Sequence, residues 1–393
     1  MIEMSQDTVG ASPRTAYVAT HHWVPNFGAN LQALATARAL GRKGIDVQFV
    51  DFRPADLIEK YEGIIPAEQL AAHEAFVSEH LPLSPRITTL AEFEEMIQEA
   101  PRDLFVTGSD AVFRLDPFSQ RADLVFPNPY WLCGAEKLPG ARLAALSPSA
   151  MGADFGRLPE TTRSGIRAQL ENFGHVSVRD AWSAKQLRAS GFTGPMTEVP
   201  DPVFSLGEMV SKMREERPGG RPYILVCPPR KTDSGWAAAF TELADAAGYD
   251  TVSLPLPEGH THAGTTHQPG FPLPPLDWMR LIAGAEGYVG VRFHPVVVSL
   301  LAGIPVVAFD MYHSHPLQRH RSKTWLLLRE VGMQRHAHSI RTHRFLTPKR
   351  VLRLLERQRA GLGARKARVD ALQRRYQDYV DLFTAPTTTG AAS

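Results

Sequence analysis

An arginine and a histidine stand two residues apart where an apolar segment of this chain ends. The apolar pattern predicts a buried strand over 287–292, ending at Arg292, and a helix over 295–302 that begins just after His294. In an open parallel sheet, ligands bind beyond the carboxyl ends of the strands. The free N–H groups at a helix start also attract an anion. This combination indicates chemistry on a phosphorylated or carboxylated small molecule, although both residues could equally cap the helix and pair with acidic neighbours.

A second arginine, Arg179, ends a strand predicted over 175–179 and precedes another predicted helix. Arg179 and Arg292 thus occupy equivalent points in the two halves of the chain, which suggests two cations facing one cleft. The planar fork of a guanidinium matches the geometry of carboxylate and phosphate groups. Two such forks suit a substrate that carries both groups.

Small polar residues follow three other predicted strands, where they could hydrogen-bond a sugar or a phosphate. The first of these loops lacks the G-x-G-x-x-G spacing, which argues against a tightly held dinucleotide. The alternative is structural, because asparagine, serine and aspartate are also the usual helix caps. The candidates in these loops are Asn26, Gly28, Asn30, Gly108, Ser109, Asp110, Ser147 and Ser149.

Strand-like and helix-like segments alternate along most of the chain, which predicts parallel sheets with crossover helices. A charged segment rich in proline and glycine at 216–222 divides the alternation into two series. We therefore expect an α/β protein of two Rossmann-like domains, with a ligand cleft between them. The expected boundaries are a disordered N-terminus at 1–14, domains at 15–215 and 216–345, a C-terminal helical tail at 346–385 and a disordered end at 386–393.

The tail is basic, and its apolar residues recur at the three-and-four spacing of a helix with one packed face. These residues are Val369, Leu372, Tyr376, Tyr379 and Phe383. A helix lying across both domains is the favoured interpretation, since the tail also carries acidic residues. A basic amphipathic helix can also lie on an anionic membrane surface.

Composition excludes several classes of protein. A length of 393 residues, 43% hydrophobic content and a net charge of +2 are ordinary for a globular protein and argue against nucleic-acid binding. The two cysteines are far apart, so no disulfide framework is expected. The start lacks a signal-peptide pattern and no run of 18 apolar residues occurs, so we expect a cytoplasmic protein.

Metal binding is the tempting interpretation of three histidine pairs, which lie at 260 and 262, 313 and 315, and 336 and 338. We expect no metal site, because these segments resemble loops and lack the H-E-x-x-H pattern or a completing ligand set. The nucleophile elbow G-x-S-x-G is also missing, which weakens a hydrolase interpretation.

Several segments together resemble the polysaccharide pyruvyl transferase family, from about residue 17 to about residue 333. They include NFGANLQALATARAL, FVTGSDAVF, LSPSAMG, VSVRDAWSAKQL, PDPVFSL and GYVGVRFHPVVVSLLAGIPVV. The resemblance implies a two-domain enzyme of the GT-B type that moves the pyruvyl group of phosphoenolpyruvate onto a saccharide. The product would be a ketal, with phosphate released, phosphoenolpyruvate as co-substrate and no cofactor. The first domain would face the acceptor and the second the donor.

The family's Arg-x-His motif falls on Arg292 and His294, and its central arginine falls on Arg179. The lysine that relatives often carry after the last strand falls on Lys323. The resemblance thus implies that Arg179, Arg292 and Lys323 bind the donor, while a histidine such as His294 can move a proton near neutral pH. Where relatives often have Gln-x-Trp after the Gly-Ser-Asp loop, this chain has Ala-Val-Phe, which leaves the acceptor open.

The acceptor implied by the resemblance is a saccharide or a lipid-linked saccharide, with peripheral association at the inner face of the membrane as one arrangement. Two alternatives stay open. One is a GT-B glycosyltransferase that uses a nucleotide sugar. The other is a non-catalytic descendant that binds a saccharide.

Overall fold

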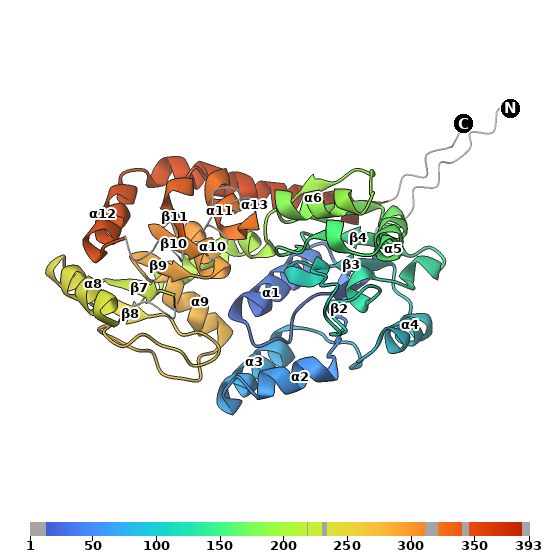
Figure 1. Ribbon diagram of the computed structural model, residues 1–393, viewed down its shortest axis with the longest axis horizontal. Coiled ribbons are helices and arrows are strands. Elements are labelled where there is room, and N and C mark those ends of the chain that lie inside the picture. The colour runs from blue at the N-terminus through green and yellow to red at the C-terminus, as the bar shows by residue number, and fades with distance from the viewer. Residues whose placement is uncertain (1–12, 218, 230–233, 311–320, 340–345, 387–393) are drawn as a thin grey trace.

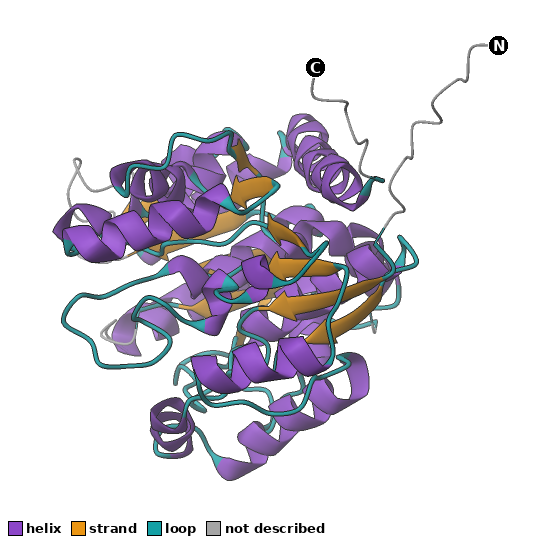
Figure 2. Ribbon diagram, turned by 90° about the vertical axis from the view of Figure 1, so that its right-hand side faces the viewer, coloured by secondary structure: helices purple, strands orange, loops and turns teal. Residues whose placement is uncertain are grey.

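The chain folds into two parallel sheets with helices on both faces of the strands (Figures 1 and 2). This computed structural model describes residues 13–217, 219–229, 234–310, 321–339 and 346–386. The expected α/β architecture of two Rossmann-like domains is confirmed. Most of the two terminal segments that we expected to be disordered, and the histidines at 313 and 315, lie outside the described residues.

The first sheet has the strand order β2-β1-β3-β4-β5-β6, and the second has β11-β10-β9-β7-β8. The first-sheet strands are β1 (Thr15–Ala19), β2 (Asp46–Phe49), β3 (Leu104–Thr107), β4 (Arg142–Ala145), β5 (His175–Val178) and β6 (Thr197–Glu198). The second-sheet strands are β7 (Tyr223–Cys227), β8 (Asp250–Ser253), β9 (Gly287–Val291), β10 (Val306–Asp310) and β11 (Ala337–Ser339).

Both sheets reverse their order beside their first strand, so β1 lies between β2 and β3, and β7 lies between β8 and β9. Ligands in open α/β sheets bind beyond the carboxyl ends of the strands at such a switch point. The residues that follow β1, β3 and β9 are therefore placed where a site is expected.

The helices of the first domain connect its strands and cover its sheet. They are α1 (Phe27–Gly41), α2 (Ala55–Glu62), α3 (Ala67–His80), α4 (Leu90–Glu99), α5 (Glu160–Glu171) and α6 (Ala181–Ala189). The sequence did not predict α2, because Leu57 is its only buried residue and eight residues carry little periodicity.

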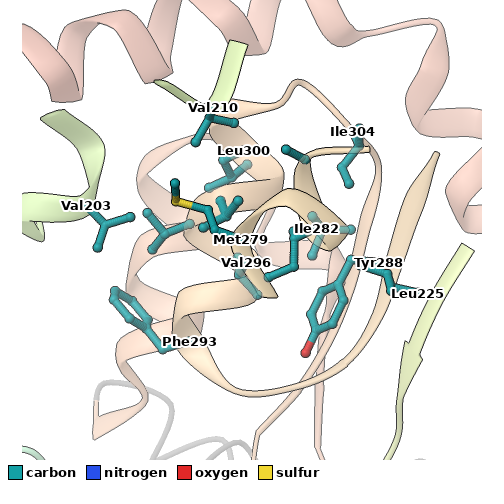
Figure 3. Packing of buried hydrophobic residues seen from close by; sticks show 14 of the residues in the cluster. Val203, Val210, Leu225, Met279, Ile282, Tyr288, Phe293, Val296, Leu300 and Ile304 are labelled. Atoms are coloured by element: carbon teal, nitrogen blue, oxygen red, sulfur yellow. The ribbon is translucent and has the colours of Figure 1, made fainter. Parts of the chain in front are cut away.

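The second series of helices comprises α7 (Gly207–Glu215), α8 (Ser234–Ala246), α9 (Pro275–Ala283), α10 (Phe293–Leu301) and α11 (Lys323–Glu330). Helix α10 is buried almost along its whole length, and Val296 and Leu300 pack there against Met279 and Ile282 of α9 (Figure 3). Phe27 and Leu31 of α1 belong to the same core cluster. The two domains thus share packing through α1, which fixes the loops that face each other across the cleft.

The tail forms α12 (Pro348–Arg359) and α13 (Leu362–Thr384). All five apolar positions expected on one face of the tail are buried. Val369 and Leu372 pack into the core cluster of the second sheet, whereas Tyr376, Tyr379 and Phe383 pack with the first. The expectation of a helix packed across both domains is confirmed, so this apolar face is covered by the protein itself.

No helix in the described part of the chain combines the length and apolarity needed to cross a lipid bilayer.

Candidate active site

A cavity of about 500 Å³ lies between the two domains. Its walls come from loops that follow β1, β3 and β9, from the start of α1 and from the start of α11. Of the residues singled out in the sequence, it is lined by Asn26, Gly28, Asp110, Arg292, His294 and Lys323. The structure therefore brings together residues that are nearly 300 positions apart in the chain.

Arg292 forms the turn between β9 and α10. Its φ of +92° is a conformation that residues other than glycine rarely adopt, and such strain concentrates at functional sites. The guanidinium is about half exposed, and its Nη2 lies 3.6 Å from Oε1 of Glu258. The turn thus presents Arg292 to the cavity directly before the N–H groups of α10.

His294 contacts a carboxylate that is fully buried beneath the cavity. Its Nε2 lies 3.4 Å from Oδ2 of Asp201, and Nη1 of Arg179 donates a hydrogen bond of 3.0 Å to the same oxygen. Burial alone would raise the pKa of Asp201, but the positive charges and hydrogen bonds of His294 and Arg179 lower it well below its usual range. Asp201 therefore stays ionised and joins the imidazole of the second domain to the guanidinium of the first.

Gly28 forms the surface against which His294 rests. A Cβ atom added at Gly28 would lie 1.7 Å from Nδ1 of His294, so only glycine leaves room for the ring. Asn26 fixes this approach, because its Oδ1 caps α1 by accepting a hydrogen bond of 3.0 Å from the N–H of Gly28. The structural alternative considered for Asn26 is thus observed, although Asn26 also lines the cavity.

Arg179 belongs to the first domain and Lys323 to the second, and both side chains approach the aromatic ring of Phe293. The guanidinium carbon of Arg179 is 5.0 Å and Nζ of Lys323 is 5.1 Å from the ring centre of Phe293. Arg179 lines a second cavity of about 210 Å³, which shares Phe293 and Lys323 with the first. Its Nε and Nη2 are buried and have no hydrogen-bond partner among the described residues. Buried donors of this kind are suited to an anionic ligand.

Asp110 is the part of the Gly-Ser-Asp loop that faces the cavity, and its φ is +71°. Its carboxylate lies 3.9 Å from Nδ1 of His21 and 3.8 Å from Nη1 of Arg179. Burial would raise the pKa of Asp110, but the charges of Lys323, His21 and Arg179 lower it overall. Burial and Arg179 in turn lower the pKa of Lys323, which Asp110 and Asp201 partly oppose.

The remaining predicted loop residues do not line these two cavities, so their contact with a ligand stays a prediction. Gly108 lies against Thr20, and Ser109 donates a 2.8 Å hydrogen bond to the carbonyl of Ser147. The hydroxyl of Ser147 donates to the carbonyl of Val199 at 2.9 Å. These groups join neighbouring strand ends inside the first domain, because the buried backbone there needs hydrogen-bond partners.

Ser149 and Asn30 are likewise held inside the first domain. The hydroxyl of Ser149 donates to Asp180 at 3.2 Å. The amide of Asn30 donates to the carbonyl of His22 at 2.7 Å, while its oxygen lies 2.6 Å from Nδ1 of His73. Both side chains therefore stabilise the loops rather than reach the cavity.

Sequence reasoning missed several residues at the site, among them His21, Asp201 and Glu258. His21 directly follows β1, so the strand-end argument applied to Arg292 could have found it. Asp201 lies after the short β6, and Glu258 lies in a long loop after β8. Nothing in their local sequence indicates that they meet His294 and Arg292 from other elements.

Histidine pairs do not form a metal site in the described part of the chain. No group of three or more histidine, cysteine, aspartate and glutamate side chains there is arranged to hold a metal ion.

Comparison with solved structures shows a likeness in fold. UDP-GlcNAc 2-epimerase from Neisseria meningitidis, bound to UDP-GlcNAc, is 7% identical, with 94% of this chain and 97% of that chain covered and a TM-score of 0.52. Spinosyn forosaminyltransferase SpnP is 12% identical, with 94% and 96% covered and a TM-score of 0.46. The glycosyltransferase SnogD from Streptomyces nogalater is 13% identical, with 95% and 98% covered and a TM-score of 0.43.

Comparison by sequence gives the family. A search of curated proteins finds no match. The family described as polysaccharide pyruvyl transferase matches residues 26–313, well over half of the chain and the part that contains Arg179, Arg292 and His294. With its two parallel α/β sheets, the chain belongs to the polysaccharide pyruvyl transferase family and is a transferase.

Proposed function

We propose that this protein transfers the pyruvyl group of phosphoenolpyruvate to hydroxyls of a saccharide, forming a ketal and releasing phosphate. The observation that carries the proposal is the arrangement around His294. Cations from both domains line two adjoining cavities: Arg292 and Lys323 of the second domain share one with His294, and Arg179 of the first lines the other, where it bonds to the same carboxylate as His294.

Phosphoenolpyruvate carries a phosphate and a carboxylate, so its site must offer several fixed donors. Arg179 has two buried N–H groups without a described partner, and a buried donor left unsatisfied costs about 1–3 kcal/mol. An oxyanion of the donor would remove this cost. Arg292 and the N–H groups at the start of α10 supply further donors, and the ammonium of Lys323 adds a charge between the two cavities.

His294 is assigned to proton transfer. Its ring lines the cavity and is held between Gly28 on one side and the carboxylate of Asp201 on the other. In the first stage an acceptor hydroxyl gives up its proton, its oxygen bonds to C2 of phosphoenolpyruvate and C3 gains a proton. In the second stage a further hydroxyl oxygen bonds to C2 as the C2–O bond to phosphate breaks, and its proton leaves with the phosphate. The products are the ketal and inorganic phosphate.

The cleft also supplies acceleration through position and charge. Holding a hydroxyl next to C2 makes the bond-forming step effectively unimolecular. Fixed cations stabilise the charge that moves onto the departing phosphate. The ionised Asp201 stabilises the imidazolium that forms while His294 carries a proton.

The test is to incubate the full chain with phosphoenolpyruvate and a glycan library, and to measure phosphate release and the mass of each acceptor. We expect acceptor-dependent phosphate release together with an acceptor heavier by one pyruvyl ketal. Parallel reactions contain UDP-glucose in place of phosphoenolpyruvate. Release of UDP without any use of phosphoenolpyruvate would support the glycosyltransferase alternative instead. Saccharide binding with turnover of neither donor would support the non-catalytic alternative.

A further inference from the structure

The cavity that contains His294 is also lined by a second set of cations, which the proposed donor site does not use. Lys60 lies in α2, and Arg114 and Arg121 lie in the loop that follows β3. All three line the same cavity as His294. They belong to the first domain, whereas Arg292 and Lys323 approach from the second.

Two of these cations have no counter-ion in contact within the part of the chain that the structure describes. Arg121 is neutralised by Asp123, to which its Nε and Nη2 donate hydrogen bonds of 3.0 and 2.7 Å. Lys60 and Arg114 make no ion pair with any residue in the described ranges; Lys60 is exposed, and Arg114 is partly buried. Long cationic side chains of this kind usually pair or extend into water.

The charges of this group also act on one another. Burial lowers the pKa of Lys60, and the positive charges of Arg121 and Arg114 lower it further, against the opposing effect of Asp123 and Asp56. Lys60 and Arg114 thus place two like charges on the wall of the same cavity. An anion placed between them would relieve this repulsion.

An aromatic hydroxyl stands beside the cations. Nζ of Lys60 lies 5.4 Å from the ring centre of Tyr61, which also lines the cavity. Burial raises the pKa of Tyr61 to about 12, so its hydroxyl remains a hydrogen-bond donor at neutral pH. A ring with one polar end suits contact with a sugar, which has both apolar faces and hydroxyl groups.

We infer that Lys60 and Arg114 bind an anionic group carried by the acceptor saccharide, whose sugar lies beside Tyr61. The identification of the occupant as the acceptor rests on the proposed function. A glycosyl phosphate and a uronate share the required chemistry, since each places an oxyanion on a sugar. The neutral hydroxyls that receive the pyruvyl group would then face His294, deeper in the same cavity.

Direct binding tests this inference with three probes built on one sugar, namely glucose 1-phosphate, glucuronic acid and methyl glucoside. Each is titrated into the full chain, with and without saturating phosphoenolpyruvate, and binding is followed by ligand-observed NMR. We expect the better anionic probe to bind roughly tenfold or more tightly than methyl glucoside, because charge-assisted hydrogen bonds exceed neutral ones. Phosphoenolpyruvate should not displace it. The tighter of the two anions identifies the source of the charge.

Variants identify the side chains that bind the anionic probes. The double variant Lys60→Gln with Arg114→Gln should lose the preference for the anionic probes while keeping its affinity for phosphoenolpyruvate. Arg292→Gln should lose affinity for phosphoenolpyruvate while keeping the preference for the anionic probes. Lys212→Gln is the matched control, because Lys212 is an exposed lysine on α7 that does not line the cavity. Circular dichroism and thermal unfolding establish that each variant is folded.

Three results overturn the inference: anionic probes that bind no more tightly than methyl glucoside, displacement of those probes by phosphoenolpyruvate, or an unchanged preference in the folded double variant. Failure of the proposed function is a different result. In that case phosphoenolpyruvate does not bind or turn over, yet the double variant still abolishes the preference for anionic sugars.

Discussion

The imidazole of His294, from the second domain, rests directly on Gly28 of the first, with no room for a side chain between them. The contact joins the start of α1 to the start of α10, and Asp201 holds the opposite edge of the ring. The position of the proton carrier therefore depends on both domains.

Gly28→Ala is expected to lower kcat by roughly 10²-fold, because displacing a reacting group by about 1 Å costs that much. The added methyl would overlap Nδ1 of His294 and force the ring or the domains apart. Steady-state kinetics with phosphoenolpyruvate measure the effect. Gly41→Ala is the control in the same helix, since a Cβ there meets nothing within 4 Å. Equal activity of both variants would contradict the packing argument.

His294→Ala should fold normally and lose turnover by roughly 10²–10⁴-fold, the usual contribution of a positioned acid–base group. Phosphate release measures turnover, and calorimetry with phosphoenolpyruvate separates binding from chemistry. His80→Ala, on the far end of α3, provides a control for loss of an imidazole. Turnover at the wild-type rate in His294→Ala would remove this residue from the mechanism.

Asp201→Asn should destabilise the protein at neutral pH by about 3 kcal/mol, because it removes the nearer of the two carboxylates that neutralise the buried guanidinium of Arg179. The pKa of Asp201 is lowered in the folded state, so its contribution is present above the unfolded pKa of about 3.9 and is lost as the pH falls through the folded value. Denaturant unfolding should therefore show a stability gap at pH 7 that narrows below about pH 4. A gap that does not depend on pH would show that the carboxylate charge is not responsible.

Arg292→Gly and Arg292→Ala should both lose activity, since each removes the guanidinium. They should differ in stability, because alanine keeps the strain of a φ of +92° and glycine does not. We expect the glycine variant to be more stable by about 1 kcal/mol. Denaturant unfolding of the two variants side by side gives this difference directly. Arg292→Lys should retain the charge but raise KM for phosphoenolpyruvate, since an ammonium lacks the fork.

The sequence predicted those features that depend on local pattern. Strand-end position was enough to select Arg292 and His294, and helical spacing was enough to select the packed face that contains Tyr376. Asp201 was missed because its importance arises from a contact between domains, which no local pattern records. Asn30 was selected because it stands where a loop meets a helix start, but its side chain bonds to His22 and His73 inside the first domain, which the local pattern does not reveal.

The first half of helix α13 packs into the core of the second domain, and its second half packs into the core of the first domain. A large rotation of one domain away from the other would have to bend α13 or remove Tyr376 and Phe383 from the core in which they are buried. Burial of each such aromatic side chain stabilises the fold by several kcal/mol, so exposing these side chains to water would cost a large part of the folding free energy. The helix therefore acts as a brace that limits how far the two domains can move apart.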